Sequence, residues 1–474
     1  MIQKNRRWKV LLVSLFACSN IVSIGQNNWP QFRGPENNMV AKSNHLPETW
    51  GTNLNVKWTF DMPGESWSSP IIYGDKIFVT SVFAEKRKEP VAPPPPPPPP
   101  PTQPDATTPT NPTAAAKPAT PPPPPPVDNS YLEEIYRWEV TCLDLKTGKE
   151  LWKQVARKGS PKARKHAASN YACETPVTDG KRVYAYFGMN GLFCYDLNGK
   201  LLWQKEIEAK ETQKNWGTGS SPVIFNNILY VLNDNEEDSW IMALDAATGI
   251  EKWKVKRQEL TTYGTPVIWK NNTRTELVTM GKTARSYDPA SGNLLWELKI
   301  GGEQAIAGPV YDKENIYLGN SGGREIITDL FCVKAGASGD ITPADSGLVS
   351  SGVKWTVRKA NINNPSPLLY DGLIYIVGGR GGDLTCFEAA TGNLVYKTKV
   401  PKVGACWSTP WIQNGKLYFF DEKGITQVVK AGKSFETISS NAIDDKFWAS
   451  VAITDNAYIF KGVKKIWCIG TTNQ

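Results

Sequence analysis

Eight positions in this sequence could place chemically useful side chains around one opening. Seven short segments each contain a proline that leads an apolar strand, as in Ser68-Ser69-Pro70-Ile71-Ile72, and an eighth, Trp448 to Ile453, lacks the proline but falls one repeat later. The residues three places before each proline, or at the matching place, are Trp67, Cys173, Gly219, Tyr263, Ile306, Asn364, Trp407 and Trp448. Half of them are aromatic. Aromatic rings at the mouth of a funnel can stack on a sugar, a flat cofactor or a side chain of a partner.

The alternative is that these side chains only plug a channel. With both interpretations open, the candidate ligand or partner funnel consists of Trp67, Cys173, Tyr263, Asn364, Trp407 and Trp448. No residue is assigned as catalytic, cofactor-binding or metal-binding.

A second repeated segment predicts the elements that position this funnel. Its best copy is Ala243-Leu244-Asp245-Ala246-Ala247-Thr248-Gly249-Ile250-Glu251-Lys252-Trp253, and related copies end at Trp152, Trp203, Trp296 and Tyr396. Each copy predicts a strand, a tight turn and a second strand, because the acid accepts turn N–H groups and glycine supplies a positive φ. The copies recur about every 40 to 50 residues, which is the length of a propeller blade.

The two segments together predict eight four-stranded blades, with the proline-led strand A innermost and the aromatic residue in strand D. Residues 55–60 form a strand D with no earlier strands, whereas the last blade has strands at 450–454, 457–461 and 465–470 but no strand D. Pairing these two partial blades closes the ring and removes an exposed sheet edge. The predicted fold is all-β: an eight-bladed β-propeller of four-stranded antiparallel blades over residues 55–474, closed by an N-terminal strand.

Residues 1–25 are typical of an export signal, with basic residues at 4–9, an apolar run at 10–17 and small residues before Gln26. The protein is therefore predicted to be exported, to the periplasm or outside the cell. Leu15-Phe16-Ala17-Cys18 also resembles a lipobox. Lipidation at Cys18 would make the protein an outer-membrane lipoprotein, and this is the predicted route to a membrane.

Two further segments flank or interrupt the predicted ring. Residues 26–54 form an N-terminal arm, in which the aromatic-rich stretch Trp29 to Pro35 is expected to pack against the ring. Residues 84–136 interrupt blade 1 with two proline runs, Pro93 to Pro101 and Pro121 to Pro126, which favour extended polyproline II structure. This insertion is either a spacer for an envelope partner or a tolerated surface insertion.

Composition excludes several classes of function. The formal net charge is +8, and loss of the basic signal leaves the mature chain close to neutral, so nothing predicts a nucleic-acid partner. The chain has two histidines, His45 and His166, and no Cys-x-x-Cys, which argues against a histidine-rich metal site or a c-type haem. Five of the eight cysteines fall in or beside predicted C strands, where they act as small hydrophobic residues, although a disulfide among them stays open.

The Asp-x-x-Thr-Gly-x-x-x-Trp copies with their Ser-Ser-Pro-Val strands resemble the tryptophan-docking repeats of β-propellers of the pyrroloquinoline quinone (PQQ) type. The blade count is similar to that of quinoprotein alcohol dehydrogenases and of the outer-membrane assembly factor BamB, and the arm resembles the N-terminal signature of exported BamB-like propellers. The resemblance implies that six tryptophans wedge between neighbouring blades: Trp58, Trp152, Trp203, Trp253, Trp296 and Trp355. Tyr396 marks a weaker copy.

Three functions from different classes follow from this resemblance. The first is a non-catalytic binding or scaffolding module of the cell envelope, monomeric, with an envelope protein or a glycan as partner. The alternatives are a PQQ-dependent oxidoreductase of alcohols or sugars that uses calcium, and a propeller that binds or processes carbohydrate. Quinoprotein dehydrogenases carry a vicinal cysteine pair and a calcium site of carboxylates and asparagine, and no residue of this chain matches either. The sequence therefore favours the binding module.

Overall fold

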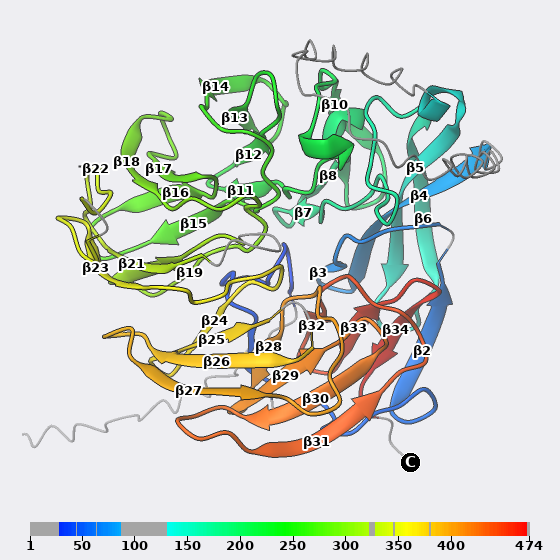
Figure 1. Cartoon of the computed structure of the whole chain (residues 1–474). Coiled ribbons are helices and arrows are strands. Elements are labelled where there is room, and N and C mark those ends of the chain that lie inside the picture. The colour runs from blue at the N-terminus through cyan, green and yellow to red at the C-terminus, as the bar shows by residue number, and fades with distance from the viewer. Residues whose placement is uncertain are drawn as a thin grey trace, which may run out of the picture.

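The computed structural model describes residues 28–43, 45–62, 64–86, 130–321, 328–344, 347–378 and 381–471. The predicted export signal with Cys18 and most of the proline-rich insertion lie outside these residues. Eight β-sheets are arranged in a ring (Figure 1), which confirms the predicted eight-bladed β-propeller. The helices in the described part are 3-10 turns at Ser130–Glu133, Gly188–Asn190 and Gln213–Asn215. No helix among the described residues is long and apolar enough to cross a membrane.

Each blade begins at the channel with a short, buried strand A. Seven of these strands start directly after the predicted proline, because proline fixes φ and lacks the N–H that a ladder would need. The A strands are β3 (Ile71–Tyr73), β7 (Val177–Thr178), β11 (Val223–Phe225), β15 (Val267–Lys270), β19 (Val310–Tyr311), β24 (Leu368–Tyr370), β28 (Trp411–Gln413) and β32 (Ala452–Ile453).

Strands B and C form the buried middle of each blade. The B strands are β4 (Lys76–Lys86), β8 (Arg182–Tyr186), β12 (Ile228–Asn233), β16 (Thr275–Thr279), β20 (Asn315–Leu318), β25 (Leu373–Val377), β29 (Lys416–Phe420) and β33 (Tyr458–Lys461). The C strands are β5 (Ile135–Asp144), β9 (Leu192–Asp196), β13 (Trp240–Asp245), β17 (Thr283–Tyr287), β21 (Leu330–Lys334), β26 (Asp383–Glu388), β30 (Ile425–Lys430) and β34 (Lys465–Ile469). Pairing of β4 with β5 extends to Lys86 and Ile135, inside the predicted bounds of the insertion.

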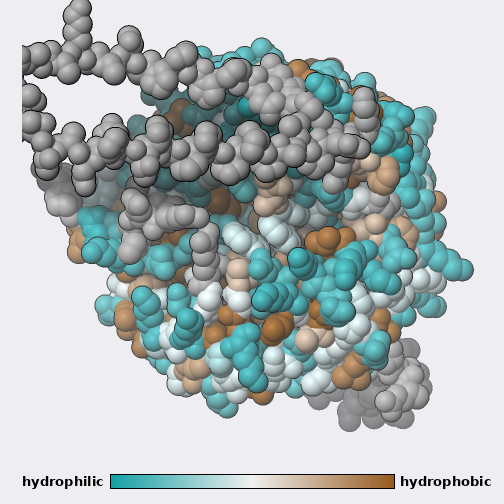
Figure 2. Space-filling model, turned by 45° about the vertical axis from the view of Figure 1, so that its right-hand side comes forward, coloured by the Kyte–Doolittle hydropathy of each residue, from teal (hydrophilic) through white to brown (hydrophobic). Residues whose placement is uncertain are grey.

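Strand D is the outer edge of each blade, where buried or half-buried side chains alternate with exposed ones. The D strands are β6 (Glu150–Gly159), β10 (Leu201–Lys205), β14 (Glu251–Lys256), β18 (Leu294–Lys299), β23 (Val353–Val357), β27 (Leu394–Lys399), β31 (Thr437–Ala442) and β2 (Val56–Asp61). On the side of the molecule that Figure 2 shows, hydrophobic residues lie singly or in small groups among hydrophilic ones, as expected for such edges.

The N-terminal strand closes the ring as predicted. Strand β2 pairs antiparallel with β34, so that blade 8 combines the two ends of the chain. Its register shifts just before Trp58, and the ladder of β14 shifts in the same way before Trp253. Because the bulge recurs, β2 acts as a full strand D and leaves no gap in the ring.

Two additional strands depart from the four-stranded pattern. Strand β1 (Val40–Ala41) pairs parallel with β28 on its channel side, which gives blade 7 a fifth, innermost strand. Strand β22 (Gly339–Asp340) belongs to the C–D connection of blade 5 and pairs parallel with β18, the outer strand of blade 4. Both strands are two residues long, which is too short for the alternation of apolar and polar residues that would predict a strand from the sequence.

A belt of hydrogen bonds joins the blades around the channel. At six blade junctions the residue directly before the proline, or Ser450 at the matching place, donates its backbone N–H to the hydroxyl of the equivalent residue in the next blade. Six bonds of this kind, 2.9 to 3.1 Å long, run from Ser69 to Thr175, Thr175 to Ser221, Ser221 to Thr265, Gly308 to Ser366, Thr409 to Ser450 and Ser450 to Ser69. This belt explains why Ser or Thr precedes the proline, since the hydroxyl satisfies a buried N–H.

Candidate functional site at the mouth of the channel

Five of the six expected docking tryptophans contact the C–D turn of the next blade. The indole N–H of Trp58 donates to the Leu145 carbonyl at 3.0 Å, and a Cβ on Gly148 would lie 2.4 Å from the Trp58 ring. Equivalent bonds of 3.0 to 3.2 Å run from Trp152 to Leu197, Trp203 to Ala246, Trp253 to Pro289 and Trp355 to Ala389. Each turn therefore requires glycine both for its positive φ and for the close approach of the ring.

Trp296 is held differently. Its indole N–H donates to Oε2 of Glu276 on its own blade at 2.6 Å, and the side chain is fully buried. Blade 5 has no Thr-Gly turn, and its longer connection instead places Ile341 in the same apolar cluster as Trp296. Trp296 therefore lies between blades 4 and 5 without the carbonyl partner that the other five share.

The N-terminal arm occupies the channel from the end where the A–B turns lie. Trp29 forms a two-way backbone bridge with Ile72 of β3, and the carbonyl of Pro30 accepts the N–H of Thr178 of β7. The side chain of Trp29 is 1% exposed. The segment before β2, drawn in blue, passes through the centre of the ring (Figure 1). The arm therefore ties together innermost strands that lie on different blades.

Arg33 fixes the arm at the far side of the channel. Its guanidinium donates to the carbonyls of Pro309 and Pro367, at 2.7 and 3.5 Å, where blades 5 and 6 begin. The side chain is 1% exposed, and burial lowers the pKa of Arg33 to about 10. A buried cation held by backbone carbonyls is costly to move, so Arg33 ties the arm to two blades at once.

The opposite end of the channel carries a stack of three tryptophans from the predicted funnel. The ring centroids of Trp67 and Trp448 are 4.0 Å apart, and those of Trp407 and Trp448 are 5.5 Å apart, with interplanar angles of 23° and 10°. These residues precede blades 1, 8 and 7, which are neighbours in the ring. The indole N–H of Trp407 also donates to Oε2 of Glu422 at 2.8 Å. All three rings are partly exposed, so they form one aromatic wall at the mouth.

The other three funnel residues do not join this stack. Cys173 lies next to it in blade 2, where its thiol contacts Ser169 Oγ at 3.3 Å, and burial raises the pKa of the thiol to about 12. The Cys173 thiol therefore stays protonated and is a poor nucleophile. Tyr263 and Asn364 are partly buried in the loops before blades 4 and 6, and no ring contact between Tyr263 and the tryptophans is found in the described ranges.

Two buried ionisable groups near the stack were not predicted from the sequence. The ammonium of Lys461 donates to the carbonyl and the hydroxyl of Ser66, at 3.1 and 2.6 Å, and burial lowers its pKa to about 7. Burial likewise raises the pKa of Glu174 to about 7, although Thr218 donates a hydrogen bond of 2.6 Å to its carboxyl group. Both groups therefore change charge close to neutral pH.

A local signal for both residues was present in the sequence. Glu174 occupies the position two before the proline, where the other copies carry Ser, Gly, Ala or Pro, and Lys461 ends the apolar strand that starts at Tyr458. A charged residue at a position that a repeat keeps small or apolar is an anomaly, and comparison of the repeat copies would have found it.

Comparisons with known proteins find a matching family model and solved structures with a similar fold. The family model described as outer membrane protein assembly factor BamB matches residues 137–340, which is less than half of the chain. A comparison with curated proteins finds no match. The quinohemoprotein alcohol dehydrogenase of Comamonas testosteroni is 10% identical to this chain, with a TM-score of 0.59. The match covers 94% of this chain and 81% of the dehydrogenase. The quinohemoprotein alcohol dehydrogenase ADHIIG of Pseudomonas putida HK5 is also 10% identical, with a TM-score of 0.56. The match covers 94% of this chain and 81% of ADHIIG.

BamB of Moraxella catarrhalis is 13% identical to this chain, with a TM-score of 0.36. The match covers 71% of this chain and 81% of BamB. The sheet order and ring closure define the protein as an eight-bladed β-propeller. Its docking tryptophans and the family match over residues 137–340 support a β-propeller of the PQQ type. Structural likeness at 10% identity supports the shared fold and no shared activity.

PQQ with a calcium ion does not fit the described residues. Trp448, the central ring of the aromatic wall, is in stacking contact with Trp67 and Trp407 and is not free to stack on a flat cofactor. The arm and Arg33 occupy the other end of the channel. Within the described ranges, no three or more His, Cys, Asp or Glu side chains are grouped so that they could hold a metal. No reaction step is therefore derived through this cofactor.

Proposed function

We propose that this chain is an exported, non-catalytic propeller that binds a protein partner in the cell envelope through its aromatic mouth. The family match supports the proposal, since that model describes an assembly factor of the outer membrane. The predicted export signal at residues 1–25 supports an envelope location.

The observation that carries the proposal is the occupied channel. In this chain the arm fills the channel end near the A–B turns, so the ring interior is built as a structural core. The opposite mouth keeps three partly exposed indoles in one wall, with Glu422 bonded to the Trp407 ring. Clustered tryptophans of this kind are typical of the energetically dominant part of a protein interface.

Site-specific photo-cross-linking in intact cells tests the proposal. A photoreactive phenylalanine analogue replaces Trp407 in one variant and Lys181, an exposed residue of an A–B turn on the opposite face, in the control. We expect discrete protein adducts from position 407 and none from position 181. The same pattern of adducts from both positions, or none from either, would contradict binding at the mouth.

The envelope location has its own test. Mass spectrometry of the mature protein is expected to show either an N-terminus at Gln26 or a lipidated Cys18, and a retained Met1 in the cell interior would contradict export.

A further inference from the structure

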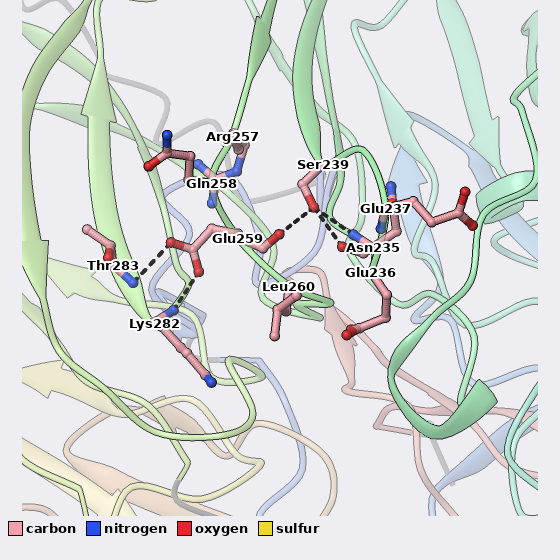
Figure 3. Close-up of a pocket in the computed structure, with 10 residues that line it drawn as sticks. All are labelled: Asn235, Glu236, Glu237, Ser239, Arg257, Gln258, Glu259, Leu260, Lys282 and Thr283. Atoms are coloured by element: carbon pink, nitrogen blue, oxygen red, sulfur yellow. Dashed lines mark hydrogen bonds between the residues drawn. The ribbon is translucent and has the colours of Figure 1, made fainter.

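A second site lies on the same face as the mouth, between blades 3 and 4. A cavity of about 360 Å³ is lined by the connections β12–β13, β14–β15 and β16–β17 (Figure 3). Its volume falls in the range of small-ligand pockets. None of the funnel residues lines it, so its function can be separated from that of the mouth.

The walls of this cavity are held by charges that are already paired. Arg257 makes a bidentate contact with Asp234, at 2.8 and 3.1 Å, and both side chains are fully buried. The Glu259 carboxylate accepts the N–H groups of Lys282 and Thr283, at 2.8 and 3.1 Å, and an Arg285 nitrogen at 2.6 Å. These groups form a rigid frame, because each is satisfied within the protein.

Two further charges of opposite sign face the cavity without an ion-pair partner among the described residues. The Glu236 carboxylate accepts bonds of 3.1 and 2.7 Å from the N–H and hydroxyl of Thr261, which are neutral donors. The Lys282 side chain is exposed, and its backbone alone is tied to Glu259. Figure 3 shows the Glu236 and Lys282 side chains extending in the same direction, with the Leu260 side chain between them. Leu260 is 46% exposed.

We propose that this cavity binds a short zwitterionic peptide. The free amino group of the peptide pairs with Glu236, its terminal carboxylate pairs with Lys282, and an apolar side chain covers Leu260. This arrangement pairs two exposed charges of opposite sign and covers one exposed apolar side chain, and a ligand with charged groups at both ends matches it. The inference goes beyond the proposed function, because it uses no residue of the mouth.

Calorimetric titration of the mature protein with the tripeptide Ala-Leu-Ala tests this site. Three ligands are compared: the free tripeptide, its N-acetylated form and its C-amidated form. They are titrated into the wild type, Glu236→Gln and Lys282→Met. Gln keeps an oxygen that accepts the Thr261 bonds, and Lys282 is exposed, so both variants should keep the wild-type melting temperature. Lys256→Met is the control, because Lys256 pairs with Asp238 at 2.9 Å outside the cavity.

We expect each end modification to weaken binding to the wild type about 10-fold. Acetylation should cause little further loss in Glu236→Gln, and amidation should cause little further loss in Lys282→Met, whereas Lys256→Met should behave as wild type. Absence of binding to the wild type at about 10 mM free tripeptide would overturn the proposal. Equal binding of all three peptides to the wild type would also overturn it, and this comparison needs no variant.

Discussion

Replacing Gly148 by alanine should open the ring where the two ends of the chain meet. Gly148 has φ +70° in the C–D turn of blade 1, and Trp58 of the N-terminal strand β2 lies directly against it. An added Cβ would lie 2.4 Å from Trp58 Cε3 and 2.5 Å from Cδ2, which is closer than any real contact. The substitution therefore combines a backbone cost with displacement of the indole that joins blade 8 to blade 1.

The expected loss of stability has two parts. An alanine held at this positive φ costs about 1 to 2 kcal/mol. Displacing Trp58 breaks its 3.0 Å hydrogen bond to Leu145, which contributes about 1 kcal/mol, and removes part of its packing, which contributes about 1 to 2 kcal/mol more. The free energy of unfolding of Gly148→Ala should therefore fall by about 3 to 5 kcal/mol.

Gly415→Ala is the matched control, because Gly415 has φ +68° and a Cβ there would meet nothing within 4 Å. It should lose only the backbone part, about 1 to 2 kcal/mol. Urea-induced unfolding followed by tryptophan fluorescence measures both variants. If the two variants lose equal stability within about 0.5 kcal/mol, Trp58 does not hold the ring closed.

Four other perturbations test separate parts of the structure. Ser450→Ala leaves the buried N–H of Thr409 without its 3.0 Å acceptor and should cost about 1 to 3 kcal/mol of unfolding free energy; an unchanged urea midpoint would argue against the belt. Trp29→Ala should cost about 3 to 5 kcal/mol and speed limited proteolysis of the arm, and wild-type resistance would contradict a buried arm. Because the pKa of Glu174 rises from 4.5 to about 7 on folding, its contribution to stability is lost as pH rises through that window, and Glu174→Gln should abolish this fall. The pKa of Lys461 falls from 10.5 to about 7 on folding, so stability decreases as pH drops through that window. Lys461→Met should make the urea midpoint independent of pH there. If the urea midpoint of either variant depends on pH as in the wild type, the charge of that residue is not buried as described.

Much of the fold could be predicted because its signals are local and repeated. A proline before seven of the eight A strands and a glycine in the repeated C–D turns fix backbone angles wherever they occur. The missing strand D of the last blade and the isolated strand at residues 55–60 could be paired by counting alone, and β2 pairs with β34 accordingly.

The rest depends on contacts between distant parts of the chain. Strand β1 is two residues long, and its pairing with β28 joins residues 40 and 412. No local sequence pattern could therefore predict this pairing. The carbonyl partners of Arg33 are 276 and 334 residues away in sequence. For the funnel, spacing predicted six candidate residues at the mouth of the channel. Only the geometry shows that three tryptophans from adjacent blades stack, and among the described residues no ring contact joins Tyr263 to them.

Calorimetric titration of the mature protein with PQQ, with and without calcium, tests most directly whether the channel is a filled core and the protein a binding module. We expect no saturable heat in either condition, because the arm and the stacked tryptophans occupy both ends of the channel. Saturable binding of one cofactor per chain, followed by dye-linked oxidation of an alcohol or sugar, would contradict a filled channel and make the mouth an active site.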